Sequence, residues 1–315
     1  MLKKLIIVSP CYNEEATLLN SGRILKSIIE ELIRERLISE ESNLLIIDDG
    51  STDKSWQLIE KLYSEDSRRY KAIKLSKNKG HQTALYAGMI EAYGNGADYV
   101  VTIDIDLQDN ISLIKTMVEK ANNGFNIIYT IKSNNIDSFL KRKTSNIFYK
   151  LLNYIGVDNI PNHADFRLVD KKILEQLSIT REKNLYLRGL IKEFGFNYTT
   201  VENVLKERKY GYSKYTIEKM FQLAQSGIIS YSKKPLYFSI YIGFIGLIFS
   251  FLFFFYIVFI FFEGSRVAGW ASILGAIIFF SSLITINLGI IALYIGKIYD
   301  ETKHRPRYII QTKLN

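Results

Sequence analysis

The chain has 315 residues, 48% of them hydrophobic, a formal net charge of +9 and one cysteine, Cys11. Its length allows one domain of ordinary size and an additional module. A single cysteine excludes an internal disulfide and a zinc site built from several thiolates. The charge does not indicate a nucleic-acid partner, because basic residues gather between Lys206 and Lys234, directly before an apolar segment, where anionic lipid headgroups explain them better.

The N-terminal part alternates short apolar runs with stretches of helical periodicity. The apolar runs are typical of buried strands and cover residues 5–9, 44–48, 72–75, 99–103 and 125–129. This alternation predicts an α/β domain with a mostly parallel sheet covered by helices on both faces. In such sheets ligands bind beyond the carboxyl ends of the strands. Residues 133–200 are less regular, with one further strand expected at 165–169.

Polar loops follow three of the predicted strands. They begin at Ser9, Asp48 and Asp104 and read SPCYNEE, DDGSTD and DIDLQ. Asp104 and Asp106 stand two residues apart, so in an extended segment they point the same way and repel each other. Mg²⁺ binds one or two carboxylates and completes its shell with substrate phosphates. This pattern predicts a divalent cation and a nucleotide diphosphate at this edge of the sheet.

Two long segments, Leu236–Phe262 and Val267–Gly296, contain no charged residue. Each exceeds the roughly 20 apolar residues that a helix needs to cross a bilayer. Basic residues flank the pair at both outer ends, which predicts that both termini lie in the cytoplasm and the short loop outside. Residues 215–230 have apolar side chains at helical spacing and are expected to lie along the membrane surface. Glycines in the spans could allow packing against copies of the chain as a homo-oligomer.

Six motifs, in order, resemble the family 2 glycosyltransferases with the GT-A fold, and among them the dolichyl-phosphate mannose synthase and bactoprenol glucosyltransferase branch. The motifs are Pro10–Glu14, Asp48–Ser51, Asn78–His81, Asp104–Gln108, Asp165–Leu168, and Arg208 with Gly211–Tyr215. Each motif alone is a weak indication, but six in order, followed by two predicted spans, cover nearly the whole chain. The implied parts are a cytoplasmic GT-A catalytic domain with a Rossmann-like sheet at 1–205, a basic amphipathic juxtamembrane segment at 206–234, a two-helix transmembrane hairpin at 235–297 and a cytoplasmic tail at 298–315.

The resemblance also implies roles for individual residues. The nucleotide-sugar is expected to contact Pro10, Tyr12, Glu14, Asp48, Asp49 and Asp104. Mg²⁺ or Mn²⁺ is expected at Asp106 and Gln108, beside the donor diphosphate. The lipid phosphate or donor diphosphate is expected to contact Arg142, Ser145, Arg208, Ser213 and Lys214. His81 is expected to begin a helix without touching substrate.

Asp104, Asp106 and Asp165 are the expected catalytic residues, and Asp165 occupies the position where many family 2 enzymes have a base. A sugar hydroxyl must lose a proton before it attacks, whereas a phosphate monoester is already anionic, with a second pKa of about 6. For a phosphate acceptor, holding two anions together matters more than removing a proton. Asp165 therefore either takes part in catalysis or orients an arginine or the acceptor.

The expected function is inverting transfer of a sugar from a nucleotide-sugar, with UDP-glucose or UDP-GlcNAc favoured, to polyprenyl (undecaprenyl) phosphate for cell-envelope glycan modification. A processive polysaccharide synthase is disfavoured, because neither Trp56 nor Trp270 stands in a Gln-x-x-Arg-Trp motif. A transferase acting on a glycan or protein hydroxyl would leave the spans and the basic segment unexplained. A membrane scaffold or small transporter remains an alternative, although spans without buried charge make a poor transport path.

Overall fold

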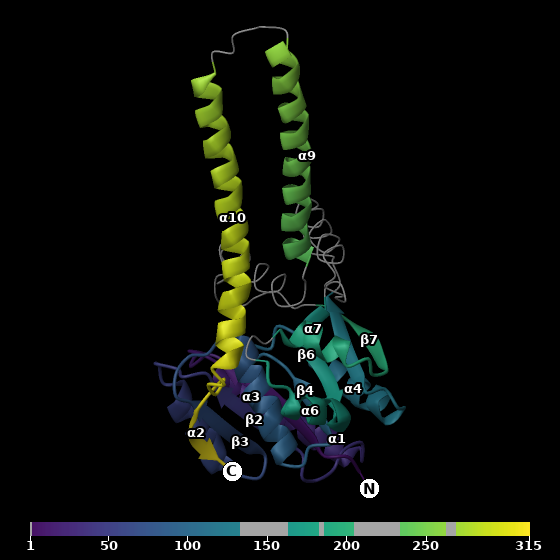
Figure 1. Ribbon diagram of the computed structural model, residues 1–315. Coiled ribbons are helices and arrows are strands. Elements are labelled where there is room, and N and C mark those ends of the chain that lie inside the picture. The colour runs from purple at the N-terminus through teal and green to yellow at the C-terminus, as the bar shows by residue number, and fades with distance from the viewer. Residues whose placement is uncertain (1, 133–162, 183–185, 205–233, 263–268) are drawn as a thin grey trace. The chain divides into compact units, whose positions relative to one another are not determined.

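The computed structural model describes residues 2–132, 163–182, 186–204, 234–262 and 269–315 (Figure 1). They divide into two compact units. The first contains the described residues up to 204 together with residues 305–315, and the second contains two long helices. The predicted contacts Arg142, Ser145, Arg208, Ser213 and Lys214, and the juxtamembrane segment up to residue 233, lie outside the described residues.

The first unit is an α/β domain built on one mixed sheet with the strand order β7-β5-β6-β4-β1-β2-β3-β8. The strands are β1 Leu5–Cys11, β2 Asn43–Asp48, β3 Tyr70–Leu75, β4 Tyr99–Thr102, β5 Ile127–Lys132, β6 His163–Asp170, β7 Tyr198–Asn203 and β8 Ile310–Leu314. Only β6 and β8 run against the direction of the other described strands. The mostly parallel sheet predicted from the sequence is confirmed.

Helices cover both faces of this sheet, as Figure 1 shows. One face carries α1 Leu18–Arg34, α2 Ser55–Glu65 and α4 Leu113–Asn122, and the other carries α3 His81–Gly94, α6 Lys171–Ile179 and α7 Leu187–Glu193. Every residue of β1, β2 and β4 is buried. Strands enclosed on both faces need apolar side chains in both directions, which is why these runs are continuously apolar rather than alternating.

The end of the chain returns to this sheet as β8, the edge strand beside β3 (Figure 1). Contacts outside the ladder also attach it. Arg307 Nη2 donates to the carbonyl oxygen of Thr180 at 2.6 Å, the rings of Tyr308 and Tyr86 meet edge to face, and the ammonium of Lys313 pairs with a carboxylate on α3. The sequence pattern does not predict this strand, because IQTKL lacks the apolar run of the central strands. An edge strand covered on one face alone needs only every second residue to be apolar.

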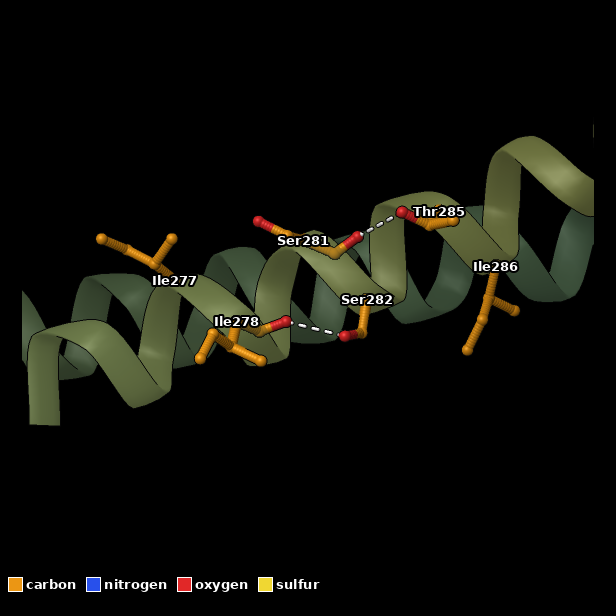
Figure 2. Close-up of a pocket in the computed structure, with 6 residues that line it drawn as sticks. All are labelled: Ile277, Ile278, Ser281, Ser282, Thr285 and Ile286. Atoms are coloured by element: carbon orange, nitrogen blue, oxygen red, sulfur yellow. Dashed lines mark hydrogen bonds between the residues drawn. The ribbon is translucent and has the colours of Figure 1, made fainter.

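The second unit consists of α9 Lys234–Phe262 and α10 Trp270–Thr302, which are candidate membrane spans by length and composition. Figure 2 shows one face of α10, where the hydroxyls of Ser282 and Thr285 donate to the carbonyl oxygens of Ile278 and Ser281, each at 2.8 Å. These bonds satisfy the hydroxyls within their own helix, as a hydrocarbon environment requires. The polar residues on this face are therefore compatible with a lipid-facing helix.

Gly88 allows α3 to approach the sheet closely. A Cβ at this position would lie 2.4 Å from Val8 Cγ1 and 2.6 Å from Ile47 Cδ1. Gly88→Ala should therefore overpack the core and cost about 1–3 kcal/mol, which lowers Tm by roughly 2–10 °C. Thermal melting of the detergent-solubilised protein measures this change. Gly94→Ala in the same helix is the matched control, because its added Cβ meets nothing within 4 Å; equal Tm values for the two variants would contradict the close approach.

Candidate active site

The candidate site forms where the carboxyl ends of β1, β2 and β4 meet the amino-terminal part of β6. Because β6 is antiparallel to β4, with Arg167 opposite Thr102, residues that precede Arg167 extend past the end of β4. The Thr102 hydroxyl donates to the carbonyl oxygen of Asp165 at 2.5 Å and joins the two strands at this point. The pairing brings Asp165 to the same edge of the sheet as the segment that begins at Asp104.

The segment after β4 holds Asp106 and Gln108 together. Leu107 has a φ of 50°, in the left-handed region that a leucine rarely adopts, and this tight turn places the side chains on either side of it next to each other. The Gln108 backbone N–H donates to Asp106 Oδ1 at 3.3 Å, and its side-chain amide donates to Asp106 Oδ2. The two residues therefore lie together in the structure, and their binding of a metal ion stays a prediction.

Asp104 lies in a concentration of negative charge. Although its side chain is 49% exposed, the surrounding protein desolvates the carboxyl and raises its pKa to about 6; His81 opposes this shift, and the charges of Asp165, Asp106 and Asp109 add to it. Such repulsion is relieved by a cation, and carboxylate and amide oxygens are the ligands that Mg²⁺ prefers. No group of three or more His, Cys, Asp or Glu in a metal-binding arrangement occurs in the described part of the chain. Two carboxylates and one amide oxygen therefore suit a cation that takes its remaining ligands from a substrate diphosphate.

Asp165 has the opposite environment, because cationic side chains surround it. The Arg188 guanidinium donates to both carboxylate oxygens of Asp165, from Nε to Oδ1 at 3.0 Å and from Nη2 to Oδ2 at 2.8 Å. Arg167 Nη2 also donates to Oδ1 at 2.5 Å, and Gln82 Nε2 donates to Oδ2 at 3.2 Å. Although burial alone would raise its pKa, the arginines and His81 hold the pKa of Asp165 well below its usual range. A carboxylate held in this way is a weak base.

His81 joins these two environments. It is the first residue of α3, as expected, and its Nε2 lies 3.6 Å from Asp104 Oδ1 and 3.5 Å from Asp165 Oδ2. Burial lowers the pKa of the imidazole, but the hydrogen bond to Asp165 and the charges of both carboxylates raise it above its usual value. His81 is therefore an electrostatic link between Asp104 and Asp165.

The predicted nucleoside residues lie on the loops after β1 and β2. The buried carboxylate of Asp48 accepts from the Ser51 N–H at 3.0 Å. Asp49 accepts from the N–H groups of Lys79 and Gly80 at 2.7 and 2.9 Å, which fixes the loop that leads into α3. Both aspartates thus stabilise the shape of the site, and their contact with a nucleoside stays a prediction.

The loop after β1 is tied to the loop after β2. The Asn13 N–H donates to Ser51 Oγ at 3.0 Å, and Asn13 Oδ1 accepts from the Thr52 N–H at 2.9 Å. Pro10 is buried in β1, Glu14 is half-buried, and Tyr12 is 39% exposed. An exposed ring beside a rigid double loop is suited to stacking on a nucleobase, which is the role expected of Tyr12.

Sequence reasoning missed Arg188 and Gln82. Arg188 stands in an apolar run, LRGLI, which resembles an ordinary helix with one solvated arginine. Its approach to Asp165 depends on how α7 packs on the sheet, which no local spacing reveals. Gln82 follows the recognised motif Asn78–His81 by one residue, and that position was the only available signal for it.

Comparisons with known proteins place this geometry in context. The family described as Glycosyl transferase family 2 matches residues 6–178. A Bacillus subtilis (strain 168) protein described as the uncharacterized glycosyltransferase YkoT is 41% identical, and the alignment covers 98% of this chain and 92% of that one. The bactoprenol glucosyl transferase of Shigella phage SfV is 35% identical over 98% of this chain and 99% of its own. Among solved structures, glucosyl-3-phosphoglycerate synthase from Mycobacterium tuberculosis with Mn²⁺ and UDP-glucose superposes with a TM-score of 0.45 at 15% identity, covering 72% of this chain and 77% of that one.

The raised pKa of Asp104 has a consequence for stability. With a pKa of about 6 in the folded protein and about 4 in the unfolded chain, the folded state binds more protons between these values, so stability falls as the pH rises through this window. Asp104→Asn should therefore raise Tm at pH 7.5 in EDTA, and the gain should shrink at pH 5. Thermal melts at both pH values test this, with the exposed Glu41→Gln as the control. A gain that is equal at both pH values, or a loss, would contradict the charge repulsion at Asp104.

Proposed function

Because the chain belongs to glycosyl transferase family 2, we propose that it transfers a sugar from a nucleotide-sugar to a polyprenyl phosphate. The observation that carries this proposal is the contrast between the carboxylates on the two sides of the site. Asp104 and Asp106 form a negative group that suits a cation and a diphosphate, whereas Asp165 is paired with arginines. A donor diphosphate and an acceptor phosphate need these two environments side by side.

The state of Asp165 favours a phosphate acceptor over a hydroxyl acceptor. A hydroxyl must give up its proton, and a carboxylate whose pKa is held well below the usual range accepts a proton poorly. A phosphate monoester needs no such base, since its second pKa is about 6. The bactoprenol glucosyl transferases that align over almost the whole chain support the same class of acceptor. UDP-glucose is the first donor to test, and UDP-GlcNAc the second.

The proposed reaction is a direct displacement. An oxygen of the acceptor phosphate forms a bond to the anomeric carbon while the bond from this carbon to the donor diphosphate breaks, so the configuration inverts. Asp106 and Gln108 would hold Mg²⁺ or Mn²⁺, and the cation would supply neutralisation of charge on the leaving diphosphate. Tyr12 and the loops that contain Asp48 and Asp49 bind the nucleoside. No proton transfer is required, so the residues of the site act by positioning and charge neutralisation.

A membrane position fits this acceptor. The two apolar helices α9 and α10 anchor the enzyme in the cytoplasmic membrane, where a polyprenyl chain is dissolved. The catalytic domain and both termini lie on the cytoplasmic side, where nucleotide-sugars are made available. The segment between Lys206 and Lys234 lies almost wholly outside the described residues, and the contact of its basic side chains with anionic headgroups stays a prediction from the sequence.

The purified full-length protein should convert undecaprenyl phosphate, in the presence of Mg²⁺ or Mn²⁺, to a lipid-linked sugar with one member of a panel of UDP- and GDP-sugars. Mass spectrometry of the extracted lipid detects the product. Asp106→Asn should lower kcat at least about 100-fold because it removes a charged ligand of the cation. Glu41→Gln changes an exposed carboxyl that precedes the first residue of β2, away from the site, and should leave the rate unchanged.

The proposal fails if no donor yields a lipid-linked sugar, or if the protein glycosylates only hydroxyl acceptors. Full activity of Asp106→Asn would remove this residue from the cation site while leaving the acceptor class intact. Melting curves of each variant show whether the fold persists, so that a loss of rate is assigned to chemistry rather than to unfolding.

A further inference from the structure

The segment between β4 and α4 carries the expected cation ligands and runs along the edge of the sheet. It leaves β4 after Thr102 and enters α4 at Leu113, and α4 packs against β7. Because β7 is parallel to β5, and both β5 and β4 are antiparallel to β6, the carboxyl ends of β7 and β4 lie at the same edge. The last residue of β7, Asn203, is therefore placed to meet this segment, although two strands separate β7 from β4.

Asn203 binds the segment through both groups of its side-chain amide. Its Nδ2 donates to Asp109 Oδ1 at 2.6 Å, and its Oδ1 accepts from the Asn110 backbone N–H at 3.1 Å. Asn203 is fully buried and Asp109 nearly so. Hydrogen bonds to a charged group are stronger than those between neutral groups, and a buried carboxylate that loses a donor is penalised. The two bonds therefore fix residues 109 and 110 against the end of β7.

These two bonds require an asparagine at position 203. An amide offers a donor and an acceptor at once, which the bonds to the Asp109 carboxylate and the Asn110 N–H both use. A leucine of similar size makes neither bond, and an aspartate keeps the acceptor but sets a second carboxylate against Asp109. Asparagine is disfavoured in strands, so its burial at the end of β7 is explained by these bonds rather than by strand propensity.

The turn that carries the expected cation ligands directly precedes these bonds. Gln108 is bound to Asp106 through its backbone N–H and its side-chain amide, and Asp109 follows it at once. Leu107, between the two expected ligands, has a left-handed φ of 50°, which costs energy for a leucine and persists only where the surroundings enforce it. The bonds of Asn203 restrain the chain on the carboxyl side of this turn and so help to enforce its shape.

We infer that Asn203 is a positioning residue for the cation site, and that it holds the turn of Asp106 and Gln108 in the arrangement that suits Mg²⁺ or Mn²⁺. The inference rests on the proposed function and adds to its cation site a residue from a distant strand. Asn203 acts through Asp109 and Asn110 rather than as a ligand. Groups that orient the ligands of a metal ion affect its affinity strongly without touching it.

Asn203→Leu tests this in the detergent-solubilised full-length protein, with Mn²⁺ as the probe. The variant removes both bonds without a change of charge and should raise the Kd for Mn²⁺, measured in the presence of UDP, about 10- to 100-fold. Electron paramagnetic resonance of free Mn²⁺ measures this Kd without any transfer reaction. Asn197→Leu changes an exposed asparagine directly before β7 and should leave the Kd unchanged.

Asn203→Asp separates positioning from charge. If only the charge near the site mattered, an added carboxylate should attract the cation and lower the Kd for Mn²⁺. If Asn203 positions the turn, repulsion between the new carboxylate and Asp109 displaces the segment, and the Kd should rise. A lower Kd in Asn203→Asp therefore overturns the positioning role. The same measurement decides the question if Asn203→Leu does not fold.

Transfer assays give a second measure of the same effect. The concentration of Mn²⁺ or Mg²⁺ that gives the half-maximal rate should rise in Asn203→Leu about 10-fold or more, while the KM for undecaprenyl phosphate stays unchanged. A residue that only stabilises the fold would lower Tm and the amount of active enzyme, but it would not move the metal requirement. An unchanged metal requirement together with a lower Tm overturns the inference.

The failure of this inference can be told apart from the failure of the proposed function. A wild-type protein that makes lipid-linked sugar and binds Mn²⁺, together with Asn203 variants of unchanged Kd, contradicts only the role of Asn203. A wild-type protein that makes no lipid-linked sugar, but binds Mn²⁺ with UDP more tightly than the variants do, contradicts the proposed acceptor and supports the role of Asn203. A wild-type protein that binds no Mn²⁺ in the presence of UDP contradicts both.

Discussion

The antiparallel pairing of β6 with β4 is the contact on which the candidate active site depends. Through it, Asp165 lies beside the segment that begins at Asp104, and the Thr102 hydroxyl binds the Asp165 carbonyl oxygen at the junction. A parallel β6 would carry Asp165 toward the opposite edge of the sheet. One reversed strand in a mostly parallel sheet therefore creates a site with two sides, because it adds residues from the start of a strand to residues from the ends of others.

The two sides differ in charge rather than in residue type. Asp104 is an aspartate whose pKa rises to about 6 because desolvation and neighbouring carboxylates disfavour its charge. Asp165 is an aspartate whose pKa is held well below the usual range by Arg188, His81 and Arg167, although burial works in the other direction. Pairs of titratable groups with opposite shifts commonly mark different roles in one site. Here one side suits a cation and the other suits an anion.

Several supporting contacts keep the two sides of the site in place. Asp49 holds the loop before α3 through the N–H groups of Lys79 and Gly80, and this loop places His81 at the start of the helix. The absence of a side chain at Gly88 lets the same helix lie close to β1 and β2. The strand β8, from the last residues of the chain, completes the edge of the sheet beside β3. The charged residues are thus carried by elements that are themselves fixed by packing.

The sequence alone determined the continuous apolar strands and the two apolar helices, because each depends on residues that are close in the chain. Strand direction, the partners of Asp165 and the place of β8 were decided only by the tertiary structure. Arg188 is 23 residues from Asp165, and β8 pairs with a strand more than 200 residues earlier. Hydrophobic periodicity reports which residues are buried in an element, but it carries no information about which element packs beside it, and the charge balance at Asp165 arises from that packing.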